Sequence, residues 1–384
     1  MLRKAFKQFA LGVKSPAQAA RVLASEAKMR AGVRTLRSLE LAVTWICNLD
    51  CEFCYAEDLM KAQRRPPDMP VDTVAKLTRD ARELGLIHVN VTGGEPMVRK
   101  DIYEVVDAIP KDVVISLVTN STLINKEKID RLKQAGLSTI QMSYGGYYLK
   151  SFKRDLARYC VEQGISVTLS VVNIRAEREN IEFAFQMAEE DDFSVLFNYP
   201  MIYNNVGLDS EYYWKMRYHP RCREDNLFWS GKDRCPAGTH KLYVTNDGDV
   251  MTCDRIHAIY GNIQQEPLAD IHKRMYEQFI RHKSFCLLET CPDQWAENNR
   301  RSGNAYSPEL LGTRSDPFNV FEGTKLMQGS IEGSTTAKRM HKARVTAAQP
   351  VAPDDGATNG SPAKGSSSVE AQPAPERDGS PART

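Results

Sequence analysis

The sequence predicts an α/β protein built on a parallel sheet, and three observations lead to that prediction. Short β-rich runs alternate with segments of helical periodicity throughout residues 38 to 200. Cysteines gather directly after the first of these runs, and glycines or small polar residues follow later ones. Chemically reactive residues after strands are typical of parallel sheets, because their active sites lie at the carboxyl ends of the strands.

The elements follow one another in a regular order. Strands are expected in six β-rich runs, at residues 39–46, 87–92, 113–119, 138–144, 166–173 and 193–199. Helices are expected between them, at residues 71–85, 100–109, 125–136, 148–164 and 177–191. Since parallel strands need a crossover connection, usually a helix, this alternation indicates β/α units.

Composition narrows the class of protein. The 384 residues carry 51 Lys and Arg against 49 Asp and Glu, so a net charge of +2 does not indicate a nucleic-acid partner. Nine cysteines are an odd number, and three of them are too closely spaced for a disulfide framework. The sequence shows no apolar stretch of membrane-spanning length and no signal-peptide pattern. We therefore expect a protein of a reducing compartment, the cytoplasm.

The two ends of the chain differ from the middle. Residues 1–37 are basic and helix-prone, with Leu2, Phe6, Phe9 and Val13 at helical spacing. This segment fits either a helix packed on its own domain or a helix in peripheral contact with a membrane. The tail, residues 333–384, contains no Phe, Trp, Tyr, Ile, Leu or Cys and is expected to be disordered.

The stretch "TWICNLDCEFCYAED" places Cys47, Cys51 and Cys54 within eight positions after the first strand. A structural zinc site would need a fourth ligand, and no His lies between residues 41 and 87. Three thiolates with one open position suit a cubane iron–sulfur cluster. The Cys-x3-Cys-x2-Cys spacing, with Phe53 before the last cysteine, resembles the radical S-adenosylmethionine (SAM) superfamily. That resemblance implies a partial (β/α)6 barrel, which we assign to residues 38–215.

Turns after the later strands extend the resemblance. "TGGEP" follows the second strand, where the family's glycines let the backbone approach the SAM amino group and a carboxylate binds that ammonium. "VTNST" resembles the family's Thr-Asn-Gly turn, although Ser121 replaces the usual Gly. The fourth and fifth strands end in "QMSYGG" and "SVVN". The resemblance implies SAM contacts from Phe53, Gly93, Gly94, Glu95, Asn120, Ser143, Ser170 and Asn173.

A second group of cysteines lies beyond the barrel. "YVTNDGDVMTC" predicts a two-stranded hairpin, with Gly248 at the positive-φ position of the turn. The surrounding pattern resembles the auxiliary-cluster extension called SPASM, or its shorter form twitch, which we assign to residues 216–332. The resemblance implies a second [4Fe–4S] cluster, although a zinc site from the same thiols is an alternative. Its ligands would be Cys235, Cys253, Cys286 and Cys291.

Two cysteines remain. Cys160 falls within a predicted helix and is expected to be an ordinary buried thiol. Cys222 is expected in a polar loop, "YHPRCREDN", near the substrate entrance. There it would be an alternative ligand of the auxiliary cluster, a hydrogen donor to a substrate radical, or a thiol with neither role.

The resemblance implies an enzyme with two [4Fe–4S] clusters and SAM, served by a one-electron reductant such as flavodoxin or ferredoxin. Reductive cleavage of SAM would give a 5′-deoxyadenosyl radical that abstracts hydrogen from the substrate. We expect oxidation or other modification of a sugar- or nucleoside-like small molecule in secondary metabolism. Alternatives are modification of a peptide, epimerisation, modification of a lipid, and a non-enzymatic iron–sulfur or zinc protein. No residue is singled out as the catalytic group.

Overall fold

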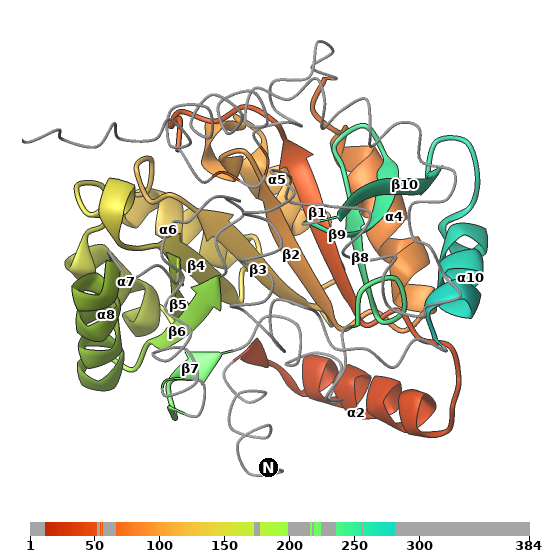
Figure 1. Ribbon diagram of the computed structural model, residues 1–384, viewed down its shortest axis with the longest axis horizontal. Coiled ribbons are helices and arrows are strands. Elements are labelled where there is room, and N and C mark those ends of the chain that lie inside the picture. Colours follow the sequence, from red (N-terminus) through yellow and green to blue (C-terminus); the bar gives the residue numbers. More distant parts are fainter. Residues whose placement is uncertain are drawn as a thin grey trace, which may run out of the picture.

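The computed structural model describes residues 12–51, 54, 56, 67–172, 177–198, 216, 219–223, 236–254 and 256–280. Within them the predicted β/α alternation is confirmed (Figure 1). The strands are β1 (Ser38–Thr44), β2 (His88–Gly93), β3 (Val114–Thr119), β4 (Thr139–Ser143), β5 (Ser166–Val172) and β6 (Ser194–Asn198). The helices between them are α4 (Val71–Glu83), α5 (Ile102–Asp107), α6 (Lys126–Gln134), α7 (Arg154–Glu162) and α8 (Arg178–Glu190).

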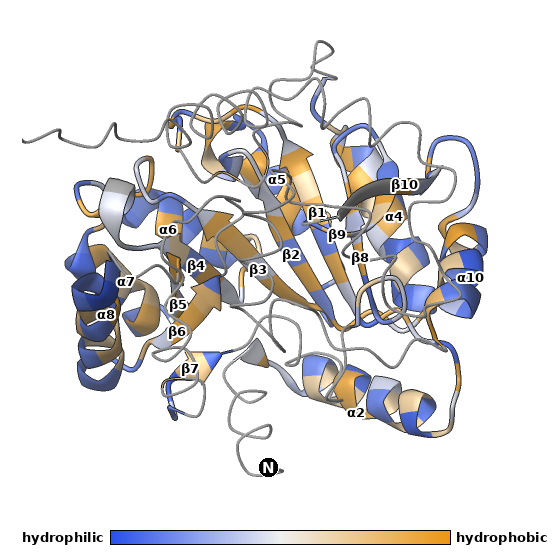
Figure 2. Cartoon of the chain, in the orientation of Figure 1, coloured by the Kyte–Doolittle hydropathy of each residue, from blue (hydrophilic) through white to orange (hydrophobic). Residues whose placement is uncertain are grey.

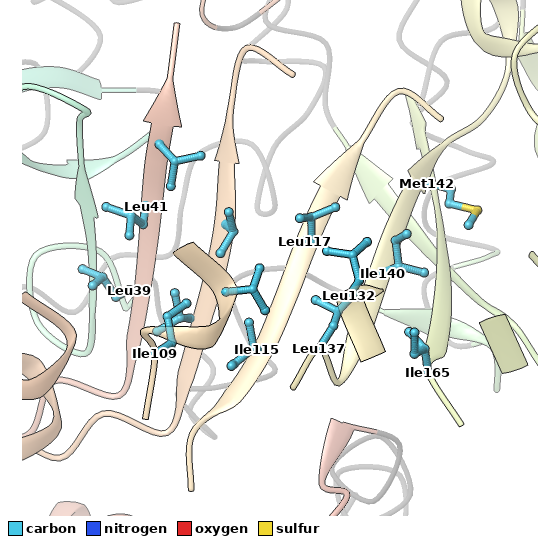
Figure 3. Packing of buried hydrophobic residues seen from close by; sticks show 14 of the residues in the cluster. Leu39, Leu41, Ile109, Ile115, Leu117, Leu132, Leu137, Ile140, Met142 and Ile165 are labelled. Carbon is cyan, nitrogen blue, oxygen red and sulfur yellow. The ribbon is translucent and has the colours of Figure 1, made fainter. Parts of the chain in front are cut away.

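Strands β1 to β6 pair in chain order, each parallel to the next. Their apolar side chains face the helices, and Figure 3 shows Leu39, Leu41, Ile115 and Leu117 on the strands with Ile109 between Leu39 and Ile115. Because side chains alternate along a strand, every second residue faces the other side of the sheet. Figure 2 shows the resulting alternation of orange and blue along β1 and β2. The face of the sheet that packs on the helices therefore forms the main core. The opposite face, which we call the inner face, is largely polar.

Hydrogen bonds order this inner face. The ring of His88 on β2 lies 3.0 Å from the Ser38 hydroxyl on β1 and 2.9 Å from the Ser116 hydroxyl on β3. All three side chains are buried. Buried polar groups are stable when they are hydrogen-bonded. The contacts of Ser38, His88 and Ser116 therefore link three neighbouring strands on the inner face of the sheet.

The predicted hairpin is present and extends the sheet. Strands β8 (Lys241–Val244) and β9 (Asp249–Cys253) are antiparallel, and Gly248 in their turn has φ +91°. Strand β8 also pairs in parallel with β1, and β9 pairs with β10 (Ile256–Asn262). The Lys241 ammonium contacts the Glu40 carboxylate of β1 at 2.5 Å, and both side chains are buried. The hairpin thus continues the barrel sheet, which the sequence did not indicate. Helix α10 (Leu268–Phe279) follows and lies beside α4 (Figure 1).

Helix α2 (Pro16–Arg30) crosses the amino-terminal ends of the strands (Figure 1). Its Gln18 amide donates to the carbonyl of Val113 at 3.1 Å, just before β3, and the Ser25 hydroxyl donates to the carbonyl of Gly85, before β2. This part of the basic N-terminal segment is therefore a helix packed on its own domain. Leu2, Phe6 and Phe9 lie outside the described residues, as does the predicted disordered tail. None of the described helices has the length and apolar character needed to cross a membrane.

The expectation for Cys222 is wrong. Cys222 forms the short strand β7 (Cys222–Arg223), which pairs with β6 through Val195, near the amino end of that strand. Its side chain is only 1% exposed and belongs to the main hydrophobic core. The polar residues around Cys222 suggested a loop. Instead, β7 pairs with the edge strand β6, and this pairing places the Cys222 thiol in the hydrophobic core. Cys160 is buried on α7 as expected, and burial raises the pKa of its thiol to about 12.

Candidate functional site

The three clustered thiols lie just beyond the carboxyl end of β1. Cys47 and Cys54 pack partly buried on a small apolar group that includes Trp45 of the same loop and Tyr243 of the hairpin. The N–H of Cys54 donates to the carbonyl of Cys51 at 3.2 Å, which links the second and third thiol residues. Burial raises the pKa of the Cys47 and Cys51 thiols. A positively charged metal centre would reverse this effect, because coordination deprotonates thiols.

Tyr148 contacts the second of the three thiols. It ends the short 3-10 helix η2 (Gly146–Tyr148) after β4, and its hydroxyl donates to Sγ of Cys51 at 3.3 Å. The pKa of Tyr148 is raised by burial and then by the charges of Cys51, Cys54 and Cys47. Cys51 is the thiol that the Tyr148 hydroxyl contacts among the described residues.

The "TGGEP" turn packs directly on the segment that leads to Cys47. The N–H of Gly94 donates to the Thr44 carbonyl, and that of Glu95 donates to the Ile46 carbonyl, each at 2.8 Å. A Cβ atom on Gly93 would lie 2.2 Å from the Thr44 oxygen, and one on Gly94 would lie 2.4 Å from the Ile46 oxygen. The structure therefore gives another reason for both glycines: they allow two backbone segments to touch.

Glu95 connects this turn to the end of β3. Its carboxylate accepts hydrogen bonds from the Met97 N–H at 3.0 Å, the Thr119 hydroxyl at 2.8 Å and the Asn120 N–H at 2.7 Å. The side chain is buried, and this burial raises the pKa of its carboxyl although the three donors oppose the shift. A carboxylate has about four acceptor sites. Donors from the part of the chain that the structure describes occupy three of these sites, which leaves a fourth for a donor such as a ligand ammonium.

Asn120 faces the first thiol. Its amide nitrogen donates to the Asn48 side chain at 2.8 Å and lies 4.0 Å from Sγ of Cys47. The next residue, Ser121, has φ +65°, in the left-handed region that favours glycine. Ser121, which replaces the glycine of the family's Thr-Asn-Gly pattern, therefore has a backbone conformation typical of glycine. A serine in this conformation is strained.

Ser143 and Ser170 lie on the far side of the same edge. They are paired in register on β4 and β5, and both are half-buried. The Ser170 hydroxyl accepts a hydrogen bond from the Asn198 amide of β6 at 2.5 Å. The edge therefore offers hydroxyl and amide groups opposite the thiols.

Some predicted site residues cannot be placed. Phe53, Asn173, Cys235, Cys286 and Cys291 lie outside the described residues. Cys253 is described and sits half-buried at the end of β9. Next to it, burial and then the Cys253 charge raise the pKa of Tyr260.

The donor set at Cys47, Cys51 and Cys54 fits an iron–sulfur cluster better than a single metal ion. Over the described ranges, no three His, Cys, Asp or Glu side chains are arranged to hold one ion. In a cubane cluster each cysteine binds a different iron, so the thiols need only surround a common volume. Cys47 and Cys54 pack on the same apolar group, and Cys51 lies between them in the sequence, which is compatible with that condition.

Thr119 and Tyr148 were missed as individual site residues. Thr119 could have been found, since it precedes Asn120 at a strand end beside the Glu95 turn. Tyr148 could not, because its approach to Cys51 spans 97 positions and depends on a turn through two glycines with positive φ.

Comparisons with known proteins agree with this arrangement. A family model described as the radical SAM superfamily matches residues 41–167, and the SPASM model, an iron–sulfur cluster-binding domain, matches residues 235–293. Among solved structures, Streptococcus suis SuiB bound to S-adenosylmethionine aligns with a TM-score of 0.52 at 18% identity, covering 71% of this chain and 75% of SuiB. At this identity the likeness concerns the fold.

Two curated relatives show how far the sequence similarity extends. A probable GTP 3',8-cyclase of Methanococcus vannielii is 34% identical over 122 residues, which cover 31% of this chain and 40% of that protein. The PqqA peptide cyclase of Granulibacter bethesdensis is 28% identical over 160 residues, which cover 38% of this chain and 42% of that protein. The chain thus spans about two fifths of the length of these relatives.

Proposed function

Because this chain belongs to the radical SAM superfamily and carries an SPASM iron–sulfur domain, we propose that it is an enzyme that cleaves SAM reductively at the edge described above. Such domains imply a [4Fe–4S] cluster and SAM, with further iron–sulfur centres from the SPASM domain. The observation that carries the proposal is the position of Cys47, Cys51 and Cys54 directly after the carboxyl end of β1, where the "TGGEP" turn packs on the segment that leads to Cys47.

We assign different roles to the residues at this edge of the sheet. Cys47, Cys51 and Cys54 hold the cluster, and the Gly94 turn fixes the loop that carries them. Glu95 offers its remaining acceptor site to the SAM ammonium, while Asn120, Ser143 and Ser170 offer amide and hydroxyl groups around it. Phe53 and Asn173 complete the proposed SAM contacts. When bound, the reduced cluster and SAM supply a 5′-deoxyadenosyl radical able to take hydrogen from a C–H bond.

The auxiliary ligands are proposed within the second matched segment. Cys235, Cys253, Cys286 and Cys291 all fall inside residues 235–293, the part that matches the SPASM model. Thiolate ligands and burial set the potential of such a centre. A one-electron reductant such as flavodoxin or ferredoxin would serve the protein.

For the substrate, we favour a hydrophilic small molecule of the sugar or nucleoside class, which is oxidised or otherwise modified. The inner face of the sheet supports this choice, because Glu40, Asn90 and Thr168 are polar and buried there. Towards the carboxyl edge Gln141, Ser143 and Asn198 become half-exposed. Such a surface hydrogen-bonds hydroxyls and amides better than it packs alkyl chains. A relative named for GTP also fits this class.

Peptide modification is the second candidate. It is favoured by the SPASM match and by the relative named PqqA peptide cyclase. Both candidates use the same cluster and the same SAM site. They differ only in what reaches the inner face of the sheet, so a substrate experiment separates them.

The test uses the full chain, reconstituted anaerobically with iron and sulfide and reduced with dithionite. Extract from cells grown in deuterated medium is divided into a low-mass fraction, a peptide fraction and a protease-treated peptide fraction. Each is incubated with the protein and unlabelled SAM, and 5′-deoxyadenosine is measured by mass spectrometry. Deuterium in 5′-deoxyadenosine reports hydrogen abstraction from a molecule of that fraction.

Deuterium transfer from the low-mass fraction supports the small-molecule proposal. Transfer from the peptide fraction that is lost after protease treatment supports peptide modification and contradicts the first choice. If the reduced protein forms no 5′-deoxyadenosine with any fraction or alone, the enzymatic proposal is wrong.

A further inference from the structure

Tyr148 donates a hydrogen bond to one of the proposed cluster ligands, Sγ of Cys51, at 3.3 Å. We propose that this hydroxyl tunes the SAM-binding cluster by stabilising its reduced state, and so raises the potential at which it accepts an electron. Tyr148 is thus a positioning residue that acts through Cys51. The inference rests on the proposed function, since it requires a cluster at Cys47, Cys51 and Cys54.

The turn that carries Tyr148 is fixed from one side by β3. The N–H of Tyr148 donates to the Gly145 carbonyl at 2.8 Å, which closes the short helix η2. The Ser151 hydroxyl lies 2.9 Å from the Asn120 carbonyl and 3.0 Å from the Tyr148 carbonyl. Ser151 therefore ties the tyrosine turn to the strand end whose Asn120 side chain faces Cys47.

Helix α8 fixes the turn from the other side. The N–H of Gly146 donates to the carboxylate of Glu177 at 2.9 Å, and the Asn180 amide holds that carboxylate at 2.8 Å. Gly145 and Gly146 have φ values of +99° and +42°. The φ of Gly145 lies in a region that residues other than glycine rarely adopt, so glycine is favoured at this position. The hydroxyl is therefore held in place before any cluster is bound.

The direction of the effect follows from charge. Reduction adds a negative charge to a cluster and its thiolates, and a donor aimed at a ligand sulfur stabilises the more negative state. Hydrogen bonds to the sulfurs are among the groups that set cluster potentials. The Asn120 amide is 4.0 Å from Cys47, a longer contact than the 3.3 Å at Cys51. Tyr148 is accordingly the stronger of these two donors.

The test is an anaerobic redox titration of the full chain, followed by electron paramagnetic resonance. The SAM-binding cluster is identified as the signal that changes when SAM is added. Tyr148→Phe removes the hydroxyl and keeps the ring. At a fixed solution potential, the ratio of reduced to oxidised cluster is expected to fall about tenfold, equivalent to about 59 mV for one electron. The matched control is Tyr159→Phe, which removes a hydroxyl that donates to Asp130 at 2.8 Å on the outer helices.

An unchanged potential in Tyr148→Phe, with full iron content, overturns the proposal. If that variant assembles less iron, fluorotyrosine at position 148 replaces it, because this side chain keeps ring and hydroxyl but is a stronger donor. It is expected to shift the potential in the opposite direction, and no shift overturns the proposal. Failure of the proposed function looks different, since the wild-type protein would then show no SAM-responsive signal.

Discussion

At the scale of single residues, the carboxyl edge of the sheet is shaped by backbone contacts as much as by reactive side chains. Gly94 touches the Ile46 carbonyl directly before Cys47, and Ser121 occupies a left-handed position beside Asn120. Both residues adjoin groups assigned to the cluster or to SAM. Substitutions there test whether the backbone positions the site.

Gly94→Ala is expected to destabilise the fold by about 1 to 3 kcal/mol, because its Cβ would clash with a backbone oxygen that cannot rotate away. It should also lower the iron retained after reconstitution, since relief of the clash displaces Cys47. Gly32→Ala is the control for bound iron: its φ of +75° strains an alanine, but an added Cβ meets no atom within 4 Å, so the retained iron should not change. Urea unfolding and iron analysis give both values. Equal retention of iron by the two variants would contradict the packing argument.

Ser121→Gly is expected to stabilise the protein by about 0.5 to 1 kcal/mol. The substitution removes a left-handed backbone strain of about 1 to 2 kcal/mol. Part of this gain is offset because glycine loses more conformational entropy on folding than serine does. Ser121→Ala keeps the strain and isolates the effect of the hydroxyl. Chemical denaturation of the three proteins measures the difference. Destabilisation by the glycine variant would show that the serine has a compensating role.

The positions of single residues were predictable where they directly follow a strand, while their roles at the site stay predictions. Cys47, Cys51 and Glu95 lie at the predicted edge, since strand ends of a parallel sheet meet there. The positions of Tyr148 and Cys222 were not predictable, because they depend on contacts between residues far apart in the sequence. A hydroxyl directed by a glycine turn, and a two-residue strand on an open edge, leave no periodic signal in the sequence.

At the scale of elements, helix α2 is held under the sheet by a charged contact. Asp112, just before β3, accepts hydrogen bonds from Arg21 of α2 at 2.6 Å and from Arg82 of α4 at 2.8 Å. Burial alone would raise the pKa of Asp112, but the two guanidinium groups outweigh it and lower that pKa. Asp112 therefore links α2 and α4 to the loop that precedes β3.

Asp112→Asn is expected to cost about 1 to 2 kcal/mol at pH 7, after allowance for solvent screening at a partly exposed site. Because the folded pKa lies below the unfolded value, the stabilisation is complete above about pH 4 and is lost as pH falls through the lowered folded pKa. The gap between wild type and variant should therefore close in acid. Urea unfolding of cluster-free, reduced protein from pH 7 to acid pH measures it.

Asp107→Asn is the control for that series, since Asp107 pairs with Lys111 at 3.0 Å on an exposed helix surface. It should change stability by no more than about 0.5 kcal/mol. A pH-independent gap for Asp112→Asn would show that the side chain acts by packing and not by charge.

The strands and helices themselves were predictable, because their hydrophobic periodicity is long and regular. The hairpin was predictable from Gly248 and its flanking β-rich residues. Its attachment to β1 was not, since the partner of an edge strand is chosen by tertiary packing and by the Glu40–Lys241 contact. A pattern of alternating residues does not specify which edge a strand will join.

At the scale of the whole molecule, one sheet links the matched radical SAM segment to the hairpin of the SPASM segment. Tyr243 of β8 and Met251 of β9 belong to the apolar group on which Cys47 and Cys54 pack. The SPASM segment therefore helps to build the environment of the first thiol group. The central claim is that these thiols hold the cluster that cleaves SAM.

That claim is tested most directly by comparing the wild-type protein with the triple variant Cys47→Ala, Cys51→Ala, Cys54→Ala after anaerobic reconstitution. Iron content, the paramagnetic signal with and without SAM, and 5′-deoxyadenosine are measured on both. The wild type is expected to form 5′-deoxyadenosine and to show a SAM-responsive signal. The variant should lose both while it keeps the iron bound by its remaining cysteines. Wild-type levels of 5′-deoxyadenosine from the triple variant would contradict the account.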